Sequence, residues 1–139
     1  IEAGLIAAGA EFCDRTDPFE AGIGFAVSFK SPDDFIGRAA LEERAAHPHR
    51  KLVGLGFEGG RVPTKGDGVF LGRAQVGEIT SAARSPILGR VVALARVDAR
   101  HAGEGTALEI GRLDGAQERI PAAVCAFPFY DPAKSRVRA

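Results

Sequence analysis

The chain is 139 residues long, and its 18 Lys and Arg residues are balanced by 18 Asp and Glu residues. This zero net charge excludes the strong positive field with which nucleic-acid-binding proteins and proteins of anionic membrane surfaces attract their partners. Apolar residues make up 45% of the chain, as in an ordinary globular protein with one core. No apolar run is long enough to span a bilayer and no signal-peptide pattern opens the chain, so a cytoplasmic location is expected.

The sequence contains no Met, even at position 1, where it opens abruptly on "IEAGLIAAG". An intact translated protein normally begins with Met. We therefore expect the chain to be part of a longer protein, without that protein's N-terminal portion. Residues 1–12 are expected to form a loose extended segment that Gly4 and Gly9 interrupt.

The stretch "TDPFEAG" (residues 16–22) predicts a one-turn helix. Asp17 suits the N-cap, and Pro18 suits the first helical position, where its missing N–H costs nothing. Glu20 is placed to complete a capping box, and Gly22 can supply the left-handed C-terminal cap. The following "IGFAVSFK" (23–30) has the Ile, Val and Phe content of a strand.

A helix over about Ile36–Ala46 is predicted next, because acidic residues precede it and Pro48 stops it. From Lys51 onward, short β-rich runs alternate with glycine-rich turns, a spacing typical of an antiparallel sandwich or barrel. The predicted fold class is mainly β: an antiparallel β-barrel after a short α+β lead-in. We divide the chain into residues 1–48 and a barrel domain over 49–139. The runs are KLVGLGF, GVFL, AQVGEITSA, RVVALARV, TALEIG and RIPAAVCAF.

Two patterns that could bind cofactors have simpler interpretations. "GLGFEG" (54–59) has the glycine spacing of a dinucleotide site, but the turn-rich "GRVPTKGDG" follows it where such a site needs a helix. The imidazoles in "HPHR" (47–50) are expected to form an exposed helix C-terminus rather than a metal site. Cys13 and Cys125 each lie among apolar residues, so buried structural thiols are expected rather than a disulfide or metal ligands.

Two further segments carry polar groups that could bind an anion. "ITSAARSP" (79–86) clusters hydroxyls and one cation before a proline, and we interpret it as turn-forming, with a phosphate or carboxylate site as the alternative. No base accompanies either Ser, so nucleophilic catalysis is not supported. The tail "YDPAKSRVRA" (130–139) is a solvated terminus or, alternatively, folds back and presents its cations to an anionic ligand.

Several motifs follow one another in a specific order from one end of the chain to the other. They are IEAGL, TDPFEAGIGFAV, DDFIGRAAL, RKLVGLGF, QVGEITSAARSPILGRVVALARV and PFYDPAKSRVR. Their order resembles the C-terminal part of the glycine-cleavage T-protein family, the folate-dependent aminomethyltransferases. The resemblance implies a three-domain cloverleaf with tetrahydrofolate in its central opening and a β-barrel as the last domain. Residues 1–48 would then be the C-terminal end of the folate-binding core with its connecting helix, and residues 16–41 would join that core to the barrel.

The resemblance also implies a chemistry: transfer of a one-carbon unit from a small amine donor to N5 of tetrahydrofolate. A lipoyl carrier protein is a further partner that the family allows. Alternatives are the folate-binding region of a sarcosine- or dimethylglycine-oxidising flavoenzyme, a sulfonium demethylase, or a non-catalytic scaffold barrel. The family's catalytic Asp and the Arg before "xEAGL" have no counterpart in this chain, so it is expected to be inactive alone. The folate-binding candidates that remain are Glu2, Lys134 and Arg136.

Overall fold

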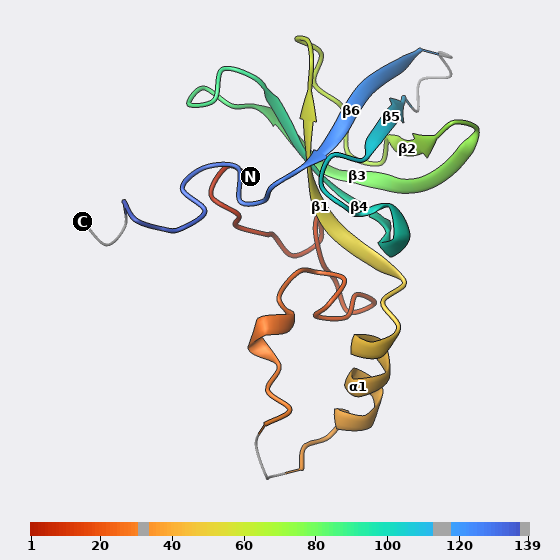
Figure 1. Ribbon diagram of the computed structural model, residues 1–139, viewed down its shortest axis with the longest axis vertical. Helices are drawn as coiled ribbons and strands as arrows, with labels where there is room; N and C mark the ends of the chain where they lie inside the picture. Colours follow the sequence, from red (N-terminus) through yellow and green to blue (C-terminus); the bar gives the residue numbers. More distant parts are fainter. Residues whose placement is uncertain (31–33, 113–117, 137–139) are drawn as a thin grey trace.

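The computed structural model describes residues 1–30, 34–112 and 118–136, and its main feature is a closed antiparallel barrel. The strands pair in the order β1-β4-β3-β2-β5-β6, so the sheet closes where β6 meets β1 (Figure 1). This confirms the predicted fold class. The strands are β1 (Arg50–Phe57), β2 (Gly68–Leu71), β3 (Ala74–Arg84), β4 (Val91–Asp98), β5 (Ala107–Gly111) and β6 (Arg119–Cys125).

Alternating side chains along the strands fill the barrel interior. In β6 every second residue is buried, as expected for a strand with one face on a core. In β4 almost every residue is buried, because its outer face is also covered by other parts of the chain. The largest fully buried side chains inside the barrel include Leu55, Ile79 and Ile110.

Strand β3 bends where its pairing register with β4 shifts between Ile79 and Ser81. Thr80 lies between them, and its hydroxyl donates a 3.1 Å hydrogen bond to the Leu94 carbonyl, which satisfies a buried polar group. Earlier in β3, Gly77 lies directly against the β4 backbone. A Cβ atom there would lie only 2.4 Å from the Arg96 carbonyl oxygen.

The lead-in, residues 1–48, has little regular structure. It contains the short helix η1 (Gly24–Ala26) and the helix α1 (Arg38–Ala46), while η2 (Ala99–His101) follows β4. The predicted helix is confirmed, but it begins two residues later because Gly37 adopts a left-handed conformation with φ 90°. His47 is the C-cap residue and is exposed, as expected. No helix within the described residues is long and apolar enough to cross a membrane.

The predicted strand over residues 23–30 is wrong. Part of it forms η1, and Phe25 leaves 89% of its surface exposed. A strand needs a neighbour for its backbone groups, and the closed barrel offers no free edge. In the described part of the lead-in, the only β pairing is an isolated bridge between Ala8 and Phe12.

The one-turn helix predicted at residues 16–22 forms as a capped turn. The Asp17 carboxylate accepts 2.9 Å hydrogen bonds from the backbone N–H groups of Phe19 and Glu20, and Gly22 has φ 74°. Glu20 contributes its backbone rather than its side chain: its carbonyl accepts a 2.9 Å hydrogen bond from Leu52 N–H. This turn therefore attaches the lead-in to β1.

Candidate functional site

The first residues of the chain, strands β3 and β4, and the C-terminal tail meet on the outer surface of the barrel. We call this region the seam and define it by residues 1–12, Ser81–Arg96 and 127–136. Figure 1 shows the tail running beside the first residues of the chain. The seam contains all three folate-binding candidates named from the sequence.

Glu11 is the centre of one half of the seam and is 3% exposed. Its carboxylate accepts hydrogen bonds from the Ser81 hydroxyl at 2.6 Å and from Ala7 N–H at 2.9 Å. Its backbone carbonyl accepts a 2.6 Å hydrogen bond from the Arg96 guanidinium. These bonds to charged groups fasten the first residues of the chain across β3 and β4.

Ser85 organises the other half of the seam. It is 1% exposed and follows β3, where its hydroxyl accepts a 2.9 Å hydrogen bond from Leu88 N–H and donates one to the Glu2 carboxylate. Residues 79–84 belong to β3, which agrees with the predicted β-run over residues 74–82, so the interpretation of residues 79–86 as turn-forming is wrong up to residue 84. The hydroxyls of Ser81 and Ser85 do bind carboxylates, but these are the chain's own Glu11 and Glu2.

The tail folds back onto the beginning of the chain. Tyr130 N–H donates a 3.0 Å hydrogen bond to the Glu2 carbonyl. The Phe129 ring occupies the space over Gly54, where a Cβ atom would lie 2.8 Å from the ring. Pro128 packs against Gly4 in the same way, with 2.6 Å to a Cβ built there. Glycines at these two positions therefore allow the tail to lie close to the backbone.

Asp131 holds the last part of the tail in a turn. Its carboxylate accepts hydrogen bonds from Ser135 N–H, from the Ser135 hydroxyl and from Arg136 N–H, at 2.8 to 2.9 Å. The Arg136 backbone bond is the largest cause of a lowered pKa for this carboxyl. Lys134 adopts φ 52°, and its N–H donates to the Asp131 carbonyl at 2.8 Å. The Arg136 guanidinium lies 5.3 Å from the centre of the Tyr130 ring.

The sequence-predicted site residues thus have different environments. Glu2 is partly buried and engaged by Ser85 and Tyr130, whereas the side chains of Lys134 and Arg136 are exposed to solvent. The structure brings Glu2 to the base of the tail that carries both cations. Their role in binding folate stays a prediction.

Sequence reasoning missed Glu11 and Arg96. Neither occurs in a motif with recognisable chemical spacing, and each becomes notable only because the fold brings residues 85 positions apart into contact. The pairing of Arg96 with Glu78 across β3 and β4, at 3.4 Å, likewise depends on strand register. Among the described residues, no group of three or more potential metal ligands occurs.

The two cysteines are free thiols in contrasting surroundings. The expectation of a buried thiol is wrong for Cys13, which is exposed on a turn, while Cys125 is half-buried. A hydrogen bond with the Thr16 hydroxyl, 3.5 Å away, is the largest cause of a lowered pKa for Cys13. Burial raises the pKa of Cys125.

Cys13 is expected to react with iodoacetamide at least about fivefold faster than Cys125 at about pH 8, because its lower pKa gives a larger thiolate fraction and its thiol is accessible. Mass spectrometry of the labelled peptides over time measures both rates. Thr16→Val removes the hydrogen bond and is expected to shift the pH of half-maximal Cys13 labelling upward. Equal rates at the two thiols, or no shift in this variant, would contradict the assignment.

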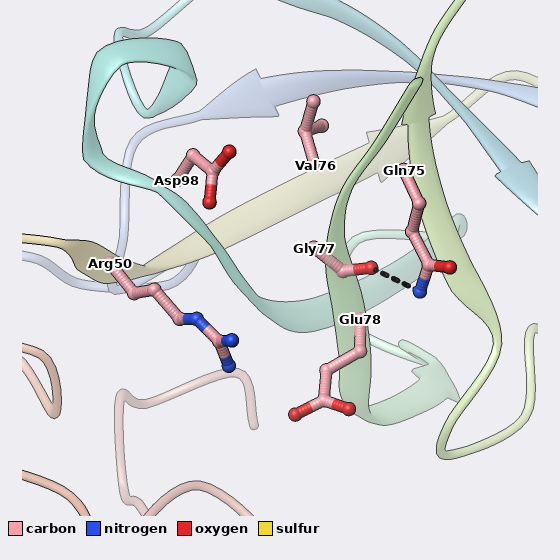
Figure 2. A pocket seen from close by; sticks show the side chains of 6 residues that line it. All are labelled: Arg50, Gln75, Val76, Gly77, Glu78 and Asp98. Atoms are coloured by element: carbon pink, nitrogen blue, oxygen red, sulfur yellow. Dashed lines mark hydrogen bonds between the residues drawn. The ribbon is translucent and has the colours of Figure 1, made fainter. Parts of the chain in front are cut away.

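A polar cavity of about 260 Å³ opens at the end of the barrel nearest the lead-in. Figure 2 shows the Arg50 guanidinium and the Glu78 carboxylate reaching into the same opening from β1 and β3. Asp98, at the end of β4, adds a second carboxylate. Gln75 is held by a 3.2 Å hydrogen bond from its side-chain nitrogen to the Gly77 carbonyl. Val76 completes the lining.

Comparison with known proteins gives the same family for the sequence and for the fold. The family model of the glycine cleavage T-protein C-terminal barrel domain matches residues 50–131. Trimethylamine-oxide aldolase of Ruegeria pomeroyi is 60% identical over 139 residues, which are 99% of this chain and 18% of that protein. Aminomethyltransferase of Streptomyces avermitilis is 47% identical over 134 residues, which are 94% of this chain and 36% of that protein.

A solved structure has the same fold. The crystal structure of glycine cleavage system aminomethyltransferase T from Bartonella henselae matches with a TM-score of 0.82 and 28% sequence identity. The match covers 92% of this chain and 36% of that one, so the chain spans about a third or less of the length of these similar proteins. The chain therefore belongs to the glycine cleavage T-protein family, whose C-terminal barrel domain it contains.

Proposed function

We propose that this chain functions within a tetrahydrofolate-dependent enzyme. The enzyme transfers a one-carbon unit from a nitrogen atom of its donor to tetrahydrofolate. The match of residues 50–131 to the T-protein barrel domain is the observation that carries this proposal. Relatives that are 37 to 47% identical are aminomethyltransferases, which supports an aminomethyl donor. A lipoyl carrier protein is the partner that such a donor implies.

A second donor is supported by the relative that is 60% identical over nearly the whole chain, a trimethylamine-oxide aldolase. Cleavage of trimethylamine oxide at one N–CH₃ group gives dimethylamine and formaldehyde, which together contain all the atoms of trimethylamine oxide. In both reactions a one-carbon unit leaves nitrogen, and tetrahydrofolate, when bound, supplies the amine that accepts it. The two donors therefore fit one acceptor site.

The tail of this chain fits the anionic end of a folate. Folate ends in a glutamate moiety with carboxylates, and Arg136 and Lys134 are cations on a turn fixed by Asp131. Stacking of the Arg136 guanidinium on Tyr130 limits its motion, which reduces the entropy lost on binding. Glu2 fits a different role: its carboxylate is engaged by Ser85, so it positions the base of the tail.

The lead-in, residues 1–48, has the exposed apolar side chains expected of a segment that packs against the folate-binding core. Among its described residues only Glu11 and Ala21 are buried, while Leu5, Phe25 and Ile36 are 80 to 105% exposed. A lead-in of 48 residues with two buried side chains does not form a core of its own. We therefore propose that residues 1–48 contact further parts of the complete protein, and that residues 49–139 form the barrel domain.

The test uses the complete polypeptide encoded by the reading frame that contains these 139 residues. It is incubated with tetrahydrofolate and either trimethylamine oxide or an aminomethylated lipoyl carrier protein, and methylene-tetrahydrofolate is measured by absorbance and mass spectrometry. Folate-dependent product from either donor supports the proposal and identifies the donor. No one-carbon product on folate from either donor would refute it.

The 139-residue chain alone is expected to bind tetrahydrofolate only weakly, with a dissociation constant of about 1 mM or higher. Two exposed cations contribute little without a pocket for the pterin ring. Isothermal titration calorimetry with the isolated chain measures this directly. Micromolar binding would show that the folate site lies within these residues, contrary to the expectation.

A further inference from the structure

The cavity between the first residues of β1 and β3 and the last residue of β4 has an unusual combination of charges. One cation, Arg50, and two carboxylates, Glu78 and Asp98, line a volume of about 260 Å³. This is several times the roughly 30 Å³ that one water molecule occupies in the liquid. The cavity therefore has room for a small organic molecule. It is separate from the tail cations Lys134 and Arg136, which do not line it.

The electrostatics of the cavity depend on which charges are already paired. Arg50 lies directly opposite Asp98 in the β1–β4 register, yet within the described residues its guanidinium makes no hydrogen bond or ion pair. Asp98 contacts Arg100 instead, at 3.4 Å. Glu78 contacts Arg96, also at 3.4 Å. These long contacts leave carboxylate lone pairs free, so both signs of charge are available to a ligand.

We propose that this cavity binds a small zwitterion, with its carboxylate on Arg50 and its ammonium group on Glu78, while Asp98 adds a second negative charge to the lining. A simple anion would pair with Arg50 but would face two carboxylates, which repel it. A simple cation would satisfy the carboxylates but leave Arg50 unpaired beside another positive charge. A molecule that carries both charges can pair with Arg50 and Glu78 together, because the charged groups of these two residues reach into the same opening in Figure 2. This inference does not depend on the proposed function.

Three probes of nearly equal size separate these possibilities: L-alanine, propionate and ethylamine. Each is titrated into the ¹⁵N-labelled 139-residue chain while the backbone amide signals of Val76, Gly77 and Glu78 are followed by NMR. We expect millimolar binding of L-alanine that is at least about threefold tighter than binding of either singly charged probe, because exposed ion pairs contribute modestly but add. No L-alanine shift at these amides, or equal affinity for all three probes, would overturn the proposal.

Two variants test the two ends of the ligand separately. Arg50→Gln is expected to abolish propionate binding and to weaken L-alanine binding about threefold, while ethylamine binding should not weaken, because a like charge has been removed. Glu78→Gln is expected to weaken ethylamine and L-alanine but not propionate. Arg73→Gln, at an exposed turn outside the cavity, is the matched control and should change none of these affinities. If Arg50→Gln and Arg73→Gln behave alike while both remain folded, the site assignment is wrong.

Discussion

The Gly77→Ala variant is expected to lose about 3 kcal/mol of unfolding free energy, because an added Cβ atom has no space beside β4. It would lie 2.4 Å from the Arg96 carbonyl oxygen and 2.9 Å from the Val97 Cα atom. Both atoms belong to the backbone of the paired strand, so they move only if the strands separate. Chemical denaturation followed by circular dichroism measures the change.

Gly56→Ala is the matched control, since it makes the same substitution in another barrel strand. A Cβ atom at Gly56 has its nearest neighbours at 3.5 Å, in ordinary van der Waals contact. This variant is expected to be unchanged or up to about 1 kcal/mol more stable, because alanine restricts the unfolded chain. Equal denaturation midpoints for the two variants would show that the β4 backbone leaves room for a Cβ atom at position 77.

The Glu11→Ala variant is expected to lose about 2 to 3 kcal/mol of unfolding free energy. This is the largest expected effect after that of Gly77→Ala. The partly buried Ser81 hydroxyl and the Ala7 N–H would each lose a partner, and bonds to a charged acceptor are among the stronger ones. Glu11→Gln retains one acceptor oxygen and is expected to lose less. The loss should be accompanied by faster proteolysis within residues 1–12, because these bonds hold that segment on the barrel.

Glu43→Ala provides the control for removing a glutamate. Glu43 is exposed on α1, and alanine favours a helix, so this variant should stay within about 0.5 kcal/mol of the parent. If Glu11→Ala is as stable as Glu43→Ala, the seam does not fasten the lead-in to the barrel. Limited proteolysis with mass spectrometry then gives an independent measurement of the same contact.

The barrel could be predicted from sequence because its signals are local. Alternating burial in β6 and glycine-containing turns between the runs correspond to side-chain direction and backbone conformation, which act within a few residues. Capping by Asp17 is equally local, and its hydrogen bonds are present. The closure of β6 onto β1 is not local, and the sequence left a sandwich open as an alternative.

The errors lie where distant residues decide the structure. Residues 23–30 have strand composition, but composition cannot reveal that no partner strand is available. Cys13 lies among apolar residues in sequence, yet the turn that ends in Thr16 directs it to solvent. Residues 79–82 belong to a predicted β-run but also contain turn-forming residues, and pairing with β4 extends β3 to Arg84 despite them.

The candidate site was only partly accessible from sequence. The charges of the tail left a solvated terminus and a folded-back segment as alternatives, and the Tyr130 bond to Glu2 agrees with the folded-back segment. The carboxylate of Asp131 fixes the turn through bonds to Ser135 and Arg136 that short-range reasoning could anticipate. The carboxylates that hold Ser81 and Ser85 come from residues 70 and 83 positions away, and no local signal identifies them.

The most direct test of the account measures the Michaelis constant for tetrahydrofolate in the complete polypeptide. Arg136→Ala and Lys134→Ala are compared with Arg73→Ala, which removes an exposed cation from the turn between β2 and β3. We predict that the Arg136 or the Lys134 variant raises this constant about tenfold, as expected for losing one charge-assisted contact to a carboxylate. If both leave it at the value of Arg73→Ala while the fold remains intact, the tail does not contribute to the folate site.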